Sequence, residues 1–166
     1  YDYIYASRTV IKNKYYNKNV GGGFYGVDVW AEADKVVRPC LSKGMTAYYE
    51  IVGYLPNGGC IQKKYDYGCV PPKEGEPYTP EKHFKVRIYR VTYTNIEGKV
   101  FEFTPHQVQQ WCAQVGLIPV EECFCGLAKD LYPDLSPSEH WNENFIDRLA
   151  GDPNFYMEQD SPHCTN

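Results

Sequence analysis

Hydrophobic and polar residues alternate along residues 84–93, the pattern of a half-buried β-strand. A turn over Asn95 to Gly98 leads from there into residues 99–103, so we predict an antiparallel hairpin with one polar and one apolar face. Residues 46–54 form a more apolar strand that contains a single carboxylate. Residues 3–12 are rich in aromatic and β-branched side chains and predict a strand that runs into a loop.

Apolar side chains recur at helical spacing in three further segments. The first covers about 28–38, and the second covers 105–115, where Thr104, Pro105 and Gln107 form a capping-box start. The third covers 136–150 and begins with a similar Ser-Pro-Ser-Glu run. Residues 117–124 read as another strand. Because strands and helices do not alternate regularly, we predict an α+β fold of antiparallel sheets flanked by helices.

Composition identifies a folded domain. The chain has 166 residues, a formal charge of −4, 43% hydrophobic residues and 23% charged residues, which excludes a wholly disordered chain, a collagen and a coiled coil. The length suits a single domain over 1–166, and no apolar run is long enough to cross a membrane. Aromatic residues reach 16%, which favours sheets and a stacking surface for a ligand.

The acidic balance argues against a dedicated nucleic-acid-binding domain but leaves room for a local basic patch. Candidate phosphate contacts are five lysines, which are otherwise solvated surface residues: Lys12, Lys14, Lys18, Lys63 and Lys64.

The seven cysteines do not follow the spacing of a zinc site. Cys123 and Cys125 are separated by one residue, and no second pair complements them or His163 and Cys164. We expect mainly buried free thiols, no metal site and a reducing, cytoplasmic setting. The sequence begins at Tyr1 and ends at Asn166, and we expect it to be a piece of a longer protein.

Glu50 is the most informative polar residue. A carboxylate inside the apolar run 47–53 is costly unless it is paired, faces a site or lies on the solvated face of a sheet. The segment by itself leaves a site and a solvated face equally open. Arg8, Arg87 and Arg90 also alternate with apolar residues, as exposed charges on strands do, and Tyr89 suits either the core or a stacking platform.

Taken in order, these segments resemble the covalent nucleotidyltransferase superfamily and, within it, the bacteriophage-type RNA ligases. Residues 48–53, Tyr-Tyr-Glu-Ile-Val-Gly, resemble the strand called motif III, which implies that Glu50 binds the ribose. Residues 84–91 resemble motif IIIa, with Tyr89 where an aromatic ring stacks on adenine. Residues 6–9, Ala-Ser-Arg-Thr, resemble the segment whose Arg contacts the ribose and the RNA end, which is Arg8 here.

The resemblance implies an ATP-dependent RNA ligase that forms lysyl-AMP and seals RNA ends, with ATP and Mg²⁺ as cofactors, in the cytoplasm of a bacterial or phage-infected cell. The family's Lys-x-Asp-Gly motif does not occur in the sequence, and its Glu-Gly-Val-Val and Lys-x-Lys motifs are expected after a region like residues 156–160, close to the last residue, Asn166. We therefore expect the middle part of a larger ligase nucleotidyltransferase domain, inactive by itself, with the nucleophilic lysine unassigned. The alternatives are a non-catalytic module that binds a nucleotide or single-stranded RNA, and a structural domain without a ligand.

Overall fold

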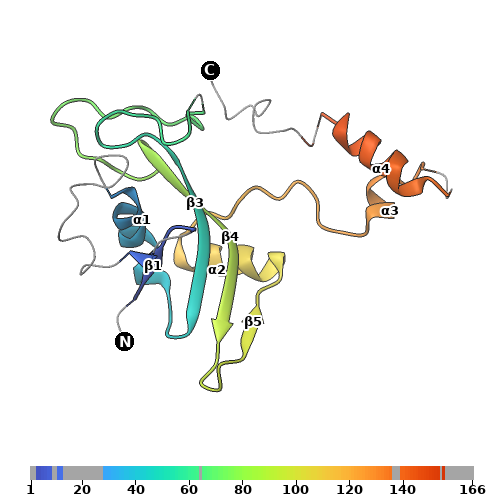
Figure 1. Cartoon of the computed structure of the whole chain (residues 1–166), viewed down its shortest axis with the longest axis horizontal. Helices are drawn as coiled ribbons and strands as arrows, with labels where there is room; N and C mark the ends of the chain where they lie inside the picture. The colour runs from blue at the N-terminus through green and yellow to red at the C-terminus, as the bar shows by residue number, and fades with distance from the viewer. Residues whose placement is uncertain are drawn as a thin grey trace. The chain divides into compact units, whose positions relative to one another are not determined.

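In the computed structural model the described residues up to Val120 form one compact unit, and those from Glu121 onward form a second (Figure 1). The structure describes residues 3–8, 11–12, 28–63, 65–135, 139–153 and 155. An antiparallel three-stranded sheet with helices confirms the predicted α+β class. That residues 1–166 belong to one larger domain stays a prediction.

The sheet of the first unit has the order β3-β4-β5. β3 covers Met45–Gly53, β4 covers Phe84–Thr94 and β5 covers Val100–Glu102. The turn between β4 and β5 is closed by Asn95, whose side-chain Oδ1 accepts the backbone N–H groups of Glu97 and Lys99. The predicted hairpin and the predicted strand over 46–54 are therefore confirmed.

One irregularity interrupts the pairing of β3 with β4. Tyr48 pairs with Arg90 and Tyr49 pairs with Ile88, so Tyr89 is an extra residue on β4 and forms a β-bulge. The bulge changes the phase of burial, because Phe84, Val86 and Ile88 are buried before it and Val91 is buried after it. The uniform alternation predicted for 84–93 is wrong at this point.

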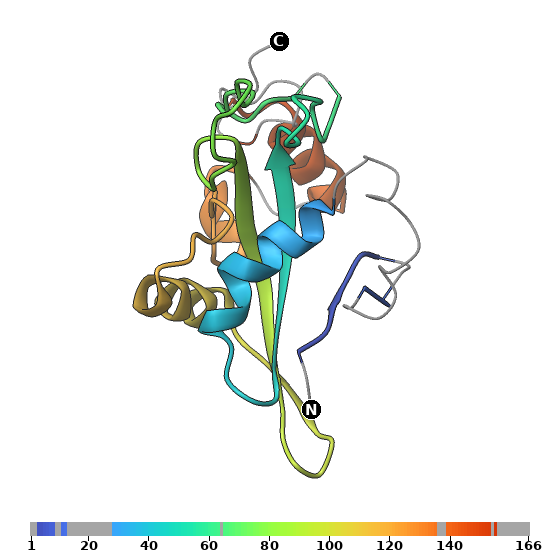
Figure 2. The same ribbon diagram turned by 90° about the vertical axis from the view of Figure 1, so that its left-hand side faces the viewer.

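Two helices cover the apolar face of the sheet. α1, Val29–Val37, begins at Asp28, whose side chain accepts the backbone N–H of Ala31 at 3.2 Å. α2, Pro105–Val115, has the predicted capping box and ends at Gly116. α1 contacts β3 and α2 contacts β4, and both views of the unit show the helices beside the strands (Figure 2). Nine buried side chains form the shared core: Ala33, Val37, Phe84, Val86, Ile88, Val91, Val108, Cys112 and Leu117.

The N-terminal strand prediction needs correction. Residues 3–12 do not form one strand, because β1, Tyr5–Ala6, pairs antiparallel with β2, Ile11–Lys12, in a short hairpin. β1 lies against α1, and the Tyr5 hydroxyl donates to Asp28 Oδ2 at 3.4 Å. The glycines at 21–23 lie outside the described residues.

Two C-terminal predictions also need correction. The strand predicted over 117–124 is reduced to one parallel bridge between Ile88 and Pro119. In this bridge the Ile88 N–H donates to the Ile118 carbonyl oxygen at 3.0 Å and the Val120 N–H donates to the Ile88 carbonyl oxygen at 2.8 Å. The predicted third helix is α4, Trp141–Ala150, and Glu139 and His140 form a turn before it. Residues 136–138 lie outside the described residues.

The second unit, taken by itself, packs aromatic rings around two helices. α3 covers Ala128–Leu131, and the rings of Trp141 and Phe145 on α4 stack at 5.0 Å. Tyr132 follows α3, contacts Phe145 and donates its hydroxyl to Asp152 Oδ2 at 2.8 Å. This unit is small and has no sheet among its described residues.

A long connection without a helix joins β3 to β4. His83 is fully buried at its end, where the ring Nδ1 lies 2.8 Å from the Val70 carbonyl oxygen. Tyr78 stacks on His83 and on Phe84 and donates its hydroxyl to the Tyr54 carbonyl at 2.6 Å. These contacts tie the connection to the end of the sheet.

We predict that Gly53→Ala destabilises the protein more than Gly58→Ala does. Both glycines have a positive φ, +105° and +81°, and an L-residue there costs about 1–2 kcal/mol. An added Cβ at Gly53 would also lie 2.7 Å from Cys69 Sγ and from the His83 carbonyl oxygen, a clash worth about 1–3 kcal/mol more. An added Cβ at Gly58 would have no heavy atom within 4 Å apart from those of Gly58 itself and its two chain neighbours, so it would not clash. Urea denaturation measures both losses, and equal losses would contradict the prediction.

Candidate functional site

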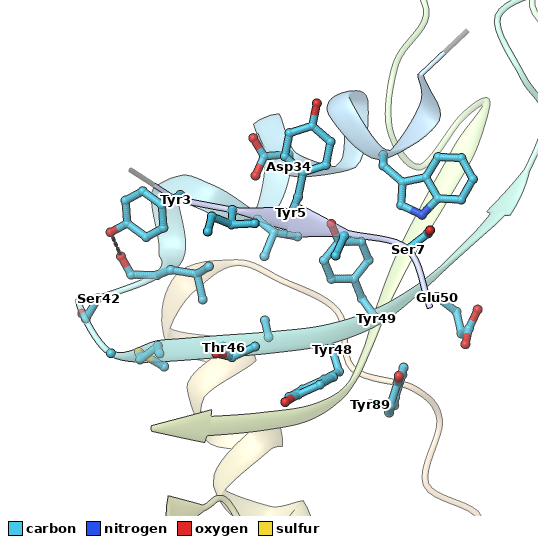
Figure 3. Close-up of a pocket in the computed structure, with 18 of the residues that line it drawn as sticks. Tyr3, Tyr5, Ser7, Asp34, Ser42, Thr46, Tyr48, Tyr49, Glu50 and Tyr89 are labelled. Atoms are coloured by element: carbon cyan, nitrogen blue, oxygen red, sulfur yellow. Dashed lines mark hydrogen bonds between the residues drawn. The ribbon is translucent and has the colours of Figure 1, made fainter. Parts of the chain in front are cut away.

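A cleft of about 1310 Å³ lies beside β3 (Figure 3). Its lining comes from residues 3–8, from α1, from residues 41–50 and from Tyr89 on β4. All three site residues predicted from sequence, Arg8, Glu50 and Tyr89, line this cleft. The fold therefore brings together side chains from three separate segments.

Tyr89 owes its position to the bulge. The extra residue lies on the outer face of the sheet with its side chain 48% exposed, so Tyr89 is not a core residue. Its ring centroid lies 6.3 Å from that of Tyr48 at an interplanar angle of 47°. Figure 3 shows both rings on one side of β3, with Tyr49 on the side that faces β1. A ring with an accessible face in a cleft can stack on a planar ligand.

Glu50 lies on the same outer face as Tyr48. The alternating residues Ala47, Tyr49 and Ile51 pack against the core instead. Glu50 is exposed, which also agrees with the solvated-face alternative. Within the described part of the chain the Glu50 side chain makes no hydrogen bond or ion pair, so its carboxylate oxygens can accept hydrogen bonds from a ligand.

Arg8 contributes a cation to the edge of the cleft. It follows β1 and is exposed. Of the lysines predicted as phosphate contacts, Lys63 does not line the cleft, while the side chain of Lys12 and the residues Lys14, Lys18 and Lys64 lie outside the described part of the chain. Lys43 lines the cleft and was not singled out from the sequence.

Tyr48 lines the cleft and is a site residue that the sequence analysis missed, and Arg90 lies over its ring. The Arg90 guanidinium lies 4.8 Å from the centroid of the Tyr48 ring, a cation–π contact. Glu102 on β5 holds it through two hydrogen bonds, both at 2.8 Å, which lower the pKa of Glu102 and raise that of Arg90. Tyr48 lies two residues before Glu50 on one strand, and this spacing was the available signal.

Two tyrosines lie near the carboxylates of α1 and its cap. Burial raises the pKa of Tyr49 to about 12, with Asp34 the next cause. Burial also raises the pKa of Tyr5, with a further contribution from the hydrogen-bonded Asp28. Both phenols therefore stay neutral near neutral pH and serve this part of the cleft as hydrogen-bonding groups.

The six described cysteines are free thiols. Cys69 and Cys112 are buried and Cys40 and Cys60 are half-buried, as predicted for packing residues, and burial raises the pKa of Cys112 to about 11. Cys123 and Cys125 are exposed, so the packing prediction is wrong for them. Their one-residue spacing lies in a segment that does not form the predicted strand.

The described residues show neither a metal-binding group nor a membrane-spanning helix. They contain no group of three or more His, Cys, Asp or Glu side chains that could hold a metal ion. His163 and Cys164 lie outside them. No helix in the described part of the chain is long and apolar enough to span a membrane.

Comparison with protein-family models, with curated proteins and with solved structures finds no match in any of the three.

We predict that Tyr49 titrates well above an ordinary tyrosine. Its pKa is raised from 10.0 to about 12, so its contribution to stability is complete below pH 10 and is lost as the pH rises through about 12. The phenolate absorbance of wild type minus that of Tyr49→Phe should show this late titration. A difference curve with its midpoint near pH 10 would contradict the prediction.

Proposed function

We propose that the cleft binds an adenine nucleotide and that the whole protein is an ATP-dependent RNA ligase-like nucleotidyltransferase. The observation that carries the proposal is the convergence of Arg8, Glu50 and Tyr89 on one cleft. In the family that the sequence resembles, the positions that match these three residues bind the nucleoside or the RNA end. They come from separate segments, so their convergence is not a consequence of sequence proximity.

The chemistry of the three side chains suits a nucleoside. The exposed Tyr89 ring supplies a stacking surface, and stacking on an aromatic ring is worth about 1–3 kcal/mol per base. The uncommitted Glu50 carboxylate accepts a hydrogen bond from a ribose hydroxyl, and hydrogen bonds to charged groups are worth about 1.5–3 kcal/mol. Arg8 supplies a planar guanidinium that can donate two hydrogen bonds to a phosphate or an RNA end.

The reaction needs more than these residues. Lysyl-AMP forms when a lysine amine attacks the α-phosphorus of ATP and pyrophosphate leaves, and no lysine of the chain is assigned to this step. The described residues contain no group of three or more His, Cys, Asp or Glu side chains that could hold a metal ion, and Mg²⁺ at nucleotide sites is usually bound through one or two carboxylates together with the substrate phosphates. ATP, Mg²⁺, RNA ends and a cytoplasmic setting belong to the proposal for the whole protein.

A second candidate function is non-catalytic binding of single-stranded RNA. The observation in its favour is the Tyr48 ring beside the Tyr89 ring, since successive bases of a single strand stack on neighbouring aromatic side chains. An oligoadenylate that binds more tightly than AMP, with a strong dependence on salt, would favour this candidate. Equal affinities would favour the mononucleotide site.

We predict that Tyr89→Ala weakens AMP binding about 5- to 150-fold, while Tyr89→Phe changes it little. The range corresponds to losing about 1–3 kcal/mol of stacking, and Phe keeps the aromatic face. Isothermal titration of the chain with AMP measures the affinity. Tyr93→Ala is the matched control, because Tyr93 is a similarly exposed tyrosine of the same strand outside the cleft. Equal effects of the two alanine variants would contradict the stacking role.

We predict that Glu50→Gln weakens AMP binding about 5- to 12-fold and leaves thermal stability near that of wild type. Glutamine keeps the shape and one acceptor oxygen but loses the charge, so a hydrogen bond worth about 1.5–3 kcal/mol becomes a neutral one worth about 0.5–1.5 kcal/mol. The control ligand is 2′,3′-dideoxyadenosine monophosphate, which has no ribose hydroxyls and should bind both proteins alike. An unchanged affinity for AMP in Glu50→Gln would support the solvated-face alternative for this residue.

A further inference from the structure

Arg87, which lies on β4 opposite the cleft residue Glu50, forms an ion pair with an unexpected partner. In the β3–β4 ladder, Glu50 lies directly opposite Arg87. Opposite residues of an antiparallel pair share a face, with Cβ atoms about 4.5–5.5 Å apart, and opposite charges there ordinarily attract. Register and charge together therefore predict a Glu50–Arg87 ion pair.

Arg87 binds Glu81 instead. Its Nη1 and Nη2 atoms donate to Glu81 Oε1 and Oε2, each at 2.9 Å, and Nη1 also donates to the Val86 carbonyl oxygen at 3.1 Å. This two-point geometry matches the planar fork of arginine to a carboxylate. The guanidinium is thereby held away from the residue that lies opposite it.

Glu81 makes these contacts from an unusual backbone conformation. Its φ is +63°, in the left-handed region that a residue with a side chain seldom adopts. The conformation is held by the turn before β4, where the Glu81 N–H donates to the Phe84 carbonyl oxygen at 2.7 Å. Backbone strain of this kind collects at functional sites, and an ion pair half exposed to solvent adds little stability to offset it.

We propose that Glu81 is a positioning residue that sequesters Arg87 and so keeps the Glu50 carboxylate unpaired for a ligand. If Glu81 were absent, Arg87 would turn to Glu50, occupy its acceptor sites and neutralise its charge. The consequence for ligand binding rests on the proposed function, in which Glu50 accepts a ribose hydroxyl. The consequence for the Glu50–Arg87 pair does not depend on any ligand.

The ligand-free test is a double-mutant cycle on stability. Glu50→Gln and Arg87→Gln are combined in the wild-type chain and in Glu81→Gln, and urea denaturation measures the coupling between them. We expect no coupling in wild type and a measurable one in Glu81→Gln. Glu102→Gln is the matched background, because it releases Arg90, which lies opposite Tyr48 rather than a carboxylate. Coupling already present in wild type, or still absent in Glu81→Gln, overturns the proposal.

The second test uses AMP as the probe. We expect Glu81→Gln to weaken AMP binding about as much as Glu50→Gln does, and Glu81→Gln/Arg87→Gln to recover at least half of the lost affinity on a logarithmic scale. A merely structural role for Glu81 would not be rescued by removing a second residue. If Glu50→Gln weakens binding and Glu81→Gln does not, the positioning role is wrong. If wild type does not bind AMP, the proposed nucleotide site is wrong, and the double-mutant cycle still decides whether Glu81 keeps Arg87 from Glu50.

Discussion

The pairing of β3 with β4 is the constraint on which the rest of this structure depends. Burial of Phe84, Val86 and Ile88 against α1 and α2 fixes which face of β4 is apolar, and each such side chain contributes about 1.5–3 kcal/mol. A slip of one residue would turn this apolar set toward solvent. The same pairing puts Tyr48 and Glu50 on the opposite face, while Ala47 and Tyr49 of the same strand pack against the core and also line the cleft.

The bulge at Tyr89 adds a local change to that register. It presents an aromatic ring on the outer face and returns Val91 to the core, so the strand keeps its packing on both sides of the irregularity. Because Tyr89 is an extra residue in the ladder, its ring can face the cleft at little cost to the core. The stacking role that we propose for Tyr89 uses this freedom.

Two arginines on the outer face are paired with carboxylates, whereas the Glu50 carboxylate has no partner among the described residues. Arg87 is held by Glu81, and Arg90 is held by Glu102 while it lies over the Tyr48 ring. Exposed pairs of this kind contribute about 0–1 kcal/mol, so their effect on stability is small. Their larger effect is on which groups remain open to a ligand, and this is the basis of the role that we propose for Glu81.

Sequence by itself determined the elements whose signals are local. The capping box at Thr104, the turn at Asn95 and the apolar face of α1 depend on neighbours within a few residues, and all three were predictable. The choice of Arg8, Glu50 and Tyr89 also came from the sequence, through a family resemblance. Tertiary structure decided the rest. The bulge depends on how two distant strands align, residues 118–120 meet the sheet at the bridge between Ile88 and Pro119 instead of forming a strand, and the Arg87–Glu81 pair depends on a turn geometry that residue types do not specify. The first two are set by contacts between segments far apart in the chain, and the third is set by the backbone conformation of a turn, which the residue pattern does not encode.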